Sequence, residues 1–430
     1  MSSDRIKMTV VGAGSYVFGR SVLFQALAEY RLSPLDIVLV DPDREMLELL
    51  AGAGRRLIRE LELDVTIEVI RDRSKALPGS DYVIYSAGLD FHKHFKIDCE
   101  VIDRHYGSHM TTEYGGVAGI SYSLRQIALI EGLLEDMQMH CPEAWLLNLA
   151  KPLPRVCQFA QDMGINTAGF CSDSQETAYV HAWRLLNDVN YNYRKARERY
   201  VLTIAGLNHF GWLLEAKDRE TGEDLLPRMR QALKGRKGFQ NPRSEGLFRG
   251  MGYMPLPDDL RIQDFLDPDS DTAQVFDVGH GAANERDKQR HVLRSIADGS
   301  LGWELLGERL PPERPVAFIA GRSFGQAQEL SSINLVNGKR CPILPEGVFI
   351  ETPARIDAEG VHADPLVLPK ALVELTARTA SVTDAIAVAA RGRKMFQLEK
   401  VVALDPIITD KKKGLNALSA CLNAHADLLW

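Results

Sequence analysis

Two residues that commonly bind transition metals each follow an apolar segment typical of a strand. Cys171 comes directly after the segment 168–170, and His209 follows the segment 201–205. In open parallel sheets ligands bind beyond the carboxyl ends of the strands, so both side chains are expected at one crevice. A thiolate and an imidazole can hold a divalent transition metal with positions open for substrate. Taken singly, each residue is more often an ordinary core-packing residue than a metal ligand.

A second group of residues has the pattern of a dinucleotide site. Gly12, Gly14 and Ser15 stand where the apolar segment 8–11 turns into a helical segment. Glycines permit the tight turn and let backbone N–H groups approach a pyrophosphate. Asp41 ends the next apolar segment, where a carboxylate binds the adenosine ribose and repels a 2′-phosphate. This pair of features favours NAD over NADP.

The glycine pattern is incomplete, and its residues also have an ordinary interpretation. Val17 occupies the place of the third glycine in G-x-G-x-x-G, and Gly19 comes two residues later. Glycine-rich turns also join strands to helices that bind nothing, and Asp41 before Pro42 is a common turn former. The position of Asp41 favours the dinucleotide site.

Polar residues at strand ends and in loops are candidates for a sugar pocket. Glu113 lies in a polar, glycine-rich loop before a long helix, and Lys151 follows the strand segment 145–147. Ordinary loop chemistry accounts for such residues as well. The candidates for substrate binding are Glu113, Asn148, Lys151, Asn208 and Arg286.

The elements that must position these residues alternate between strand and helix in the first half of the chain. Apolar residues recur three and four apart at 46–61 and 124–139, which predicts helices. Units of this length predict right-handed crossovers and a Rossmann-like, doubly wound parallel sheet, an α/β fold. Strands are predicted at 8–11, 37–40, 65–70, 82–85 and 145–147.

The pattern changes near residue 200 to a mixed α+β arrangement. A strand is predicted at 348–350 and a helix at 381–390, and the segment 218–269 is rich in Pro, Gly and charge. That composition predicts loops over a site. We therefore expect an NAD-binding domain over 1–200 and a substrate or oligomerisation domain over 201–430.

The composition excludes several classes of protein. The chain has 430 residues, 45% hydrophobic and 25% charged, with a formal charge of -7, which indicates a soluble globular protein of two or three domains. A mildly acidic chain without a basic stripe is a poor nucleic-acid binder. No apolar run reaches a membrane span, and the six cysteines form no CxxC pair. We expect a cytoplasmic enzyme with reduced thiols.

These residues together resemble the NAD-dependent family-4 glycoside hydrolases. The resemblance implies a second domain of the lactate/malate dehydrogenase type and a small-molecule glycoside as substrate. It rests on motifs in their order: Gly12-Ala13-Gly14-Ser15, Leu39-Val40-Asp41, Tyr106-Gly107, Glu113, Gly115-Gly116, Leu124-Arg125, Cys141-Pro142-Glu143-Ala144-Trp145, Cys171, Gly206-Leu207-Asn208-His209-Phe210, Phe248-Arg249-Gly250-Met251-Gly252-Tyr253-Met254-Pro255, Ile333-Asn334-Leu335-Val336-Asn337-Gly338 and Ala403-Leu404-Asp405-Pro406.

The resemblance also implies a redox-assisted elimination. Cys171 and His209 would ligate a manganese-like cation. NAD would take hydride from C3, a base would remove the acidified C2 proton, and the aglycone would leave C1. Water would then add and the hydride would return. In the family the base is a Tyr or an Asp after the metal histidine; Tyr253, Asp258 and Asp259 fall there, and Asp173 is a further catalytic candidate.

The chain departs from the family in ways that bear on its substrate. Lys151-Pro152 stands where the family has Asn-Pro, and Ser172-Asp173-Ser174 follows the metal cysteine. The chain is therefore a divergent member or belongs to a sister family such as the NAD-dependent sulfoquinovosidases. A cation at the pocket edge predicts an anionic sugar: sulfoquinovose, a 6-phospho-sugar or a uronic acid.

Alternatives to these assignments stay open at this point. Lys151 could instead pair with an internal carboxylate, Asp173 or Glu113. An NAD-dependent 2-hydroxy-acid or sugar dehydrogenase on the same fold is the second function, and an inactive dinucleotide-binding protein is the third. We also expect a homodimer or homotetramer.

Overall fold

The fold is that of a computed structural model of the chain. It describes residues 5–15, 17–107, 113–187, 191–234, 242–257, 259–266 and 282–429. None of the helices within these ranges is both long and apolar enough to cross a membrane.

The first half of the chain forms a parallel sheet with Rossmann order. The order is β3-β2-β1-β4-β5-β6, and every neighbouring pair is parallel. It reverses between β1 and β4, which is the switch point where ligands bind in such sheets. Its strands are β1 (Ile6–Val11), β2 (Leu35–Val40), β3 (Val65–Val69), β4 (Tyr82–Tyr85), β5 (Trp145–Asn148) and β6 (Thr167–Gly169).

Helices cover both faces of this sheet because both faces of its strands are apolar. Along β2, Ile37 and Leu39 belong to the core under α1 and α2, whereas Val38 and Val40 belong to the core under α5 and α6. This split follows from the alternation of side chains along a strand. The helices of this half are α1 (Gly19–Phe24), η1 (Gln25–Glu29), α2 (Arg44–Glu60), α3 (Arg73–Ala76), α4 (Phe91–His105), α5 (Gly116–His140) and α6 (Leu153–Asp162).

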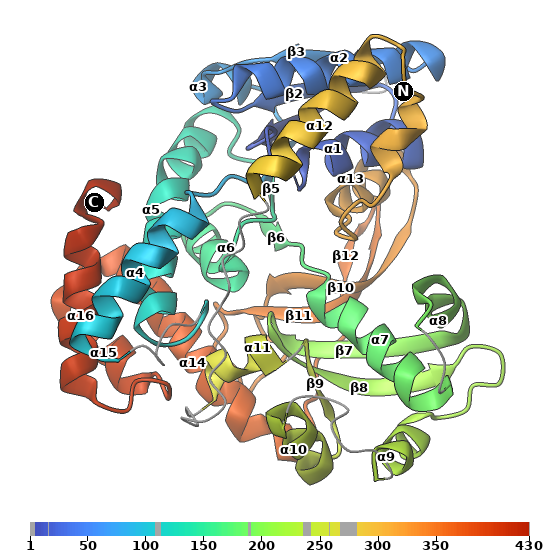
Figure 1. The fold of residues 1–430 in the computed structure, drawn as a ribbon. Coiled ribbons are helices and arrows are strands. Elements are labelled where there is room, and N and C mark those ends of the chain that lie inside the picture. The colour runs from blue at the N-terminus through green and yellow to red at the C-terminus, as the bar shows by residue number, and fades with distance from the viewer. Residues whose placement is uncertain are drawn as a thin grey trace.

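The second half continues the same sheet with antiparallel strands. β10 pairs with β6, and β11, β7, β8 and β9 follow outwards, so one sheet runs through the molecule (Figure 1). β7 begins at Tyr200, beside the predicted domain boundary, and the division into 1–200 and 201–430 stays a prediction. The strands are β7 (Tyr200–Leu207), β8 (Phe210–Asp218), β9 (Met254–Leu256), β10 (Gln328–Val336), β11 (Phe349–Asp357) and β12 (Gly360–His362).

The remaining helices lie around this antiparallel part and along the first half (Figure 1). They are α7 (Asp173–Asn187), α8 (Tyr193–Arg199), α9 (Leu226–Lys234), α10 (Pro242–Met251), α11 (Asp259–Ile262), η3 (Gln263–Phe265), α12 (Ala282–Ala297), η4 (Trp303–Gly307), α13 (Pro315–Phe324), α14 (Lys370–Gly392), α15 (Met395–Leu404), α16 (Lys411–Ala424) and η5 (Ala426–Leu428).

The C-terminal helices return to the first half of the chain. α14 packs on α6, and α16 packs on α4 and α5 (Figure 1). Buried Asp98 on α4 accepts a hydrogen bond of 2.7 Å from Arg125, and His425 Nε2 lies 3.1 Å from its other oxygen. These contacts fasten the end of the chain to the Rossmann helices.

The expectation that 218–269 is a stretch of loops is wrong. Its described part contains α9, α10, β9 and α11. Pro227 is the second residue of α9 and Pro242 the first of α10. Proline is favoured at helix starts because the first N–H groups have no partner within the helix, so these prolines begin helices where loops were predicted.

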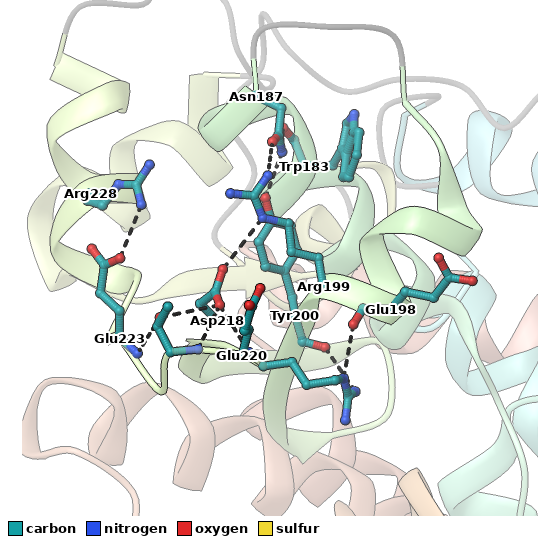
Figure 2. Close-up of polar contacts among 11 residues, drawn as sticks. Trp183, Asn187, Glu198, Arg199, Tyr200, Asp218, Glu220, Glu223 and Arg228 are labelled. Atoms are coloured by element: carbon teal, nitrogen blue, oxygen red, sulfur yellow. Dashed lines mark hydrogen bonds and ion pairs between the residues drawn. The ribbon is translucent and has the colours of Figure 1, made fainter.

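The β7–β8 hairpin is fastened at the end opposite its turn. Arg199 binds Asp218 at 3.5 Å, and Asn187 donates to the hydroxyl of Tyr200 at 2.6 Å (Figure 2). Tyr200 pairs with Asp218 in the ladder, and Leu207 pairs with Phe210 beside the turn. The polar network therefore holds the two strands whose turn carries His209.

Candidate active site

The glycine turn after β1 is built around Asp41. Gly12 has φ of +86°, and a Cβ there would lie 2.5 Å from the backbone nitrogen of Ala87, so only glycine fits. The N–H of Gly14 donates to Asp41 Oδ2 at 3.0 Å. The carboxylate at the end of β2 thus lies against the turn, where a ribose would be bound.

Two further residues of this turn have structural roles. Ser15 Oγ accepts hydrogen bonds from the N–H groups of Val17 and Phe18, so it holds the turn that precedes α1. A Cβ on Gly19 would lie 2.0 Å from the carbonyl oxygen of Ala13. Gly19 therefore permits the close strand–helix contact that the third glycine of the fingerprint usually permits. It stands two residues after the usual position of that glycine.

Cys171, Asp173 and His209 come together beyond the end of β6. Cys171 Sγ lies 3.6 Å and Asp173 Oδ2 lies 3.2 Å from His209 Nε2. One ligand atom from each residue lies within 4.8 Å of the others. His209 stands in the turn between β7 and β8 with φ of +60°, a conformation that is uncommon in residues other than glycine. Sulfur, nitrogen and oxygen donors that converge in this way fit a divalent transition metal.

The electrostatics of this cluster favour charged side chains. Burial lowers the pKa of His209, but Asp173 and Cys171 outweigh that effect and raise it to about 10. Burial raises the pKa of Asp173, but His209 and Lys151 outweigh it and hold the pKa well below its usual range. His209 Nδ1 is buried and has no hydrogen-bond partner among the described residues. A metal ion at Nε2 must therefore displace a proton.

The loop at 113–115 and the β7–β8 turn meet beside this cluster. The ring of Tyr114 lies 4.5 Å from the ring of His209, and its hydroxyl donates to Asn208 Oδ1 at 3.4 Å. The amide nitrogen of Asn208 is buried without a partner among the described residues. Glu113 lies 3.8 Å from Arg261. The structure thus brings Glu113 and Asn208 toward His209.

Asn148 and Lys151, which follow one strand, have different surroundings. Asn148 donates to the carbonyl of Ala150 and to Cys157 Sγ, and it accepts from the N–H of Ala150, so its amide holds its own turn. The ammonium of Lys151 is buried and is acted on by the charges of Cys171, Asp173 and Glu313. The hydrogen bonds of Asn148 agree with the alternative that it stabilises its own loop.

The other candidates lie elsewhere or outside the described residues. The ring of Tyr253 lies 5.4 Å from the guanidinium of Arg230. Arg286 is exposed on α12, which packs mainly on α2. Asp258 lies outside the described residues, as does the side chain of Asp259 at the start of α11. The roles predicted for these residues stay predictions.

Asp264 is a site residue that the sequence did not single out. It is buried and accepts a hydrogen bond of 2.7 Å from the N–H of Tyr114. Burial and the charge of Glu113 raise the pKa of Asp264 well above its usual range, against the charges of His209 and Arg261. Several acidic residues follow Pro257, and spacing alone does not distinguish Asp264 among them.

Glu351 on β11 is a second such residue. It is buried and accepts hydrogen bonds from Ser332 at 2.5 Å and from Ser174 at 3.2 Å. Burial raises the pKa of Glu351, and the two hydroxyls with the charges of His209 and Lys151 offset only part of that effect. Glu351 is far along the chain from Cys171 and His209, so the sequence gave no indication that it lies near them.

A small cavity adjoins Cys171. It measures about 60 Å³ and is lined by Ser172, Arg197, Glu313 and Arg314 among others. Pockets for small molecules have volumes of about 300 to 1,000 Å³, so a hexose does not fit in it.

The fold and the site together are typical of a dinucleotide-binding enzyme with a metal-ligand cluster at the edge of its sheet. A family model described as family 4 glycosyl hydrolase matches residues 7–182, and the model of the C-terminal domain of that family matches residues 204–408. The chain belongs to family 4 of the glycosyl hydrolases. The predicted family and the predicted class of enzyme, a glycosidase, are confirmed.

Curated relatives act on several kinds of sugar. An α-galactosidase of Bacillus subtilis is 30% identical over 53% of this chain and 51% of its own length, so the chain matches about half of that relative. An α-glucosidase of Erwinia rhapontici is 25% identical over 88% of both chains. An α-galacturonidase of B. subtilis is 23% identical over 97% of this chain and 98% of its own.

Solved structures agree with the predicted fold. A 6-phospho-α-glucosidase from gut microorganisms, in complex with NAD and Mn²⁺, has a TM-score of 0.77 at 19% identity over 99% of both chains. A malate dehydrogenase of Plasmodium falciparum has a TM-score of 0.50 at 13% identity over 90% of this chain and 99% of its own. The predicted α/β class, a Rossmann-like half joined to a second part, is confirmed. The ligands of the first structure agree with the cofactors predicted for this chain.

Proposed function

We propose that this protein hydrolyses glycosides of an anionic hexose, with NAD as a redox cofactor and a divalent metal ion. The observation that carries the proposal is the placement of two sites along one sheet edge. The turn at Gly12 and Gly14 with Asp41 follows β1 and β2, and Cys171 with its cluster follows β6. Family membership supports the same reaction.

The residues of the turn fit NAD. The turn backbone lies where a pyrophosphate is bound in Rossmann folds, and the Asp41 carboxylate would accept hydrogen bonds from the adenosine ribose. Its negative charge would repel a 2′-phosphate. Bound NAD supplies reversible hydride acceptance at C3 of the sugar, so the dinucleotide is not consumed.

The cluster fits a divalent ion through three donors. Cys171, Asp173 and His209 would hold the ion and leave its other positions to substrate oxygens. A bound ion supplies Lewis-acid chemistry, which acidifies the proton at C2. Tyr114, packed on the His209 ring, would keep the imidazole in place.

Asp264 joins the candidates for the base that removes the C2 proton. Burial and Glu113 raise the pKa of this carboxyl, so its ionised form is a stronger base than an ordinary carboxylate. Its carboxylate accepts a hydrogen bond from the backbone N–H of Tyr114, and the ring of Tyr114 packs on His209. Tyr253, Asp258 and Asp259 stay candidates from the sequence.

The anionic character of the sugar is supported by a relative and by charge. The α-galacturonidase, named for an acidic sugar, matches this chain over nearly its whole length. Arg261, a cation, lies beside Glu113 next to the cluster. Sulfoquinovose, 6-phospho-sugars and uronic acids carry anions at C6.

The test is a set of chromogenic glycosides of glucose, 6-phosphoglucose, glucuronic or galacturonic acid and sulfoquinovose, each with and without NAD and Mn²⁺. Aglycone release that requires NAD, and that is fastest with one anionic sugar, is the expected result. If the neutral glucoside is hydrolysed as fast as the anionic glycosides, the proposed class of anionic substrates is wrong. Net NADH formation without aglycone release favours the alternative dehydrogenase.

A further inference from the structure

A buried cation lies beside the metal-ligand cluster. Asn148 at the end of β5 pairs with Gly169 at the end of β6, so Lys151 and Cys171 extend from neighbouring strand ends. Lys151 Nζ is buried, and Cys171 acts on it as a side-chain hydrogen-bond partner as well as through its charge. The charges that act on it are chiefly those of Cys171 and Asp173, with Glu313 behind them. The ammonium is therefore directed at the ligand set.

We propose that Lys151 is the internal counter-ion of the Cys171–Asp173–His209 cluster and makes its metal binding weak and exchangeable. The inference rests on the proposed role of this cluster in holding the ion. It also assigns Lys151 to the metal site, where the sequence had suggested the anion of the substrate.

The physical reason lies in the charge that a metal-free cluster must bury. The half-buried carboxylate of Asp173 needs accompanying cations, and in the metal-free cluster it has two, the protonated imidazole of His209 and the ammonium of Lys151. A metal ion at Nε2 displaces the proton of His209, whereas the ammonium of Lys151 remains beside the cluster. A divalent ion then enters a site that already holds a positive charge and is repelled by it. The amide that the family resemblance implies at this position would carry no such charge.

The experiment is a titration of the protein with Mn²⁺ alone, without NAD or substrate, followed by the electron paramagnetic resonance signal of free Mn²⁺. Lys151→Met keeps the length of the side chain and removes its charge, and Lys151→Arg keeps the charge. Lys217→Met, at an exposed lysine on β8, is the matched control. Lys151→Met should bind Mn²⁺ on the order of 10- to 100-fold more tightly than the wild type. Lys151→Arg and the control should bind as the wild type does.

Thermal unfolding gives a second readout of the same variants. Metal-free Lys151→Met should melt below the wild type, and Mn²⁺ should raise its Tm by more than it raises that of the wild type. If Lys151→Met folds only with Mn²⁺ present, that dependence supports the proposal. The Mn²⁺ affinity of an uncharged variant is then measured on Lys151→Asn instead. Unchanged or weaker Mn²⁺ binding by the uncharged variants overturns it.

The substrate role of Lys151 has a different signature. If Lys151→Met loses the preference for anionic over neutral glycosides while its Mn²⁺ affinity stays that of the wild type, the lysine binds substrate and the proposal is wrong. Because Mn²⁺ binding is measured without substrate, a failure of the glycosidase activity leaves this test intact.

Discussion

At the scale of single residues, we propose that Asp41 decides the choice of dinucleotide. Its carboxylate is held by the N–H groups of Gly14 and Asp43, so its orientation is set before any ligand binds. A hydrogen bond to a charged group contributes about 1.5 to 3 kcal/mol.

We therefore predict that NAD binds on the order of 10- to 100-fold more tightly than NADP, and that Asp41→Ala removes most of this preference. Calorimetric titration with both dinucleotides measures it, with Asp64→Ala, at an exposed aspartate, as the control. Equal affinity of the wild type for both dinucleotides would remove Asp41 from the site.

Asp264 is the residue whose replacement tests proton removal. Asp264→Asn can still accept the hydrogen bond from Tyr114, so the loop should keep its place. The variant should lose about 10²- to 10⁴-fold in kcat, with little change in dinucleotide binding. In D₂O, wild-type product should carry deuterium at C2. Undiminished turnover by Asp264→Asn would return the role of base to the other candidates.

At the scale of elements, α7 carries a histidine that is buried in its neutral form. Burial lowers the pKa of His181 to about 3, and the charge of Arg184 adds to that effect. The unfolded chain binds the proton near the ordinary pKa of about 6.5, so it takes up more protons than the folded chain between these values. The contribution of His181 to stability is therefore present above this window and is lost as the pH falls through it.

The expected loss on going from pH 7 to pH 5 is about 2 kcal/mol from this residue. His181→Gln does not titrate and should reduce the pH dependence of the unfolding free energy by about that amount. Denaturant unfolding at several pH values measures it, with exposed His92→Gln as the control. The same pH dependence in His181→Gln and in the wild type would show that His181 is not the group concerned.

The contact of α4 and α5 with the C-terminal segment depends on Asp98. Its carboxylate pairs with Arg125 and lies beside His425, all three being nearly inaccessible to solvent. Removing one partner of a buried pair leaves an uncompensated charge, so Asp98→Ala should cost about 3 to 5 kcal/mol. Glu198→Ala, at the exposed pair with Arg194, should cost at most about 1 kcal/mol. Similar midpoints of unfolding for both variants would contradict this difference.

At the scale of the whole molecule, local patterns predicted the first half better than the second. Glycine turns, apolar strands and their alternation with helices are short-range signals, and they predicted the parallel sheet that is observed. The insertion of β10 and β11 between β6 and β7 joins segments far apart in sequence, and no local pattern encodes it.

The same difference applies to the site. Cys171 and His209 could be predicted because each lies just beyond the end of a strand, and the structure brings them together with Asp173. Asp264 and Glu351 reach the site through long-range packing, so their sequence neighbours gave no indication of it. The oligomeric state and the cytoplasmic location stay predictions.

The central claim is that NAD acts catalytically in the hydrolysis of a glycoside. The direct measurement is the number of aglycone molecules released per molecule of NAD, with the dinucleotide limited to one equivalent of enzyme and NADH absorbance recorded throughout. We predict many turnovers per NAD with no accumulation of NADH beyond one equivalent. Release that continues equally without NAD, or that stops after one equivalent with matching NADH, would contradict the account.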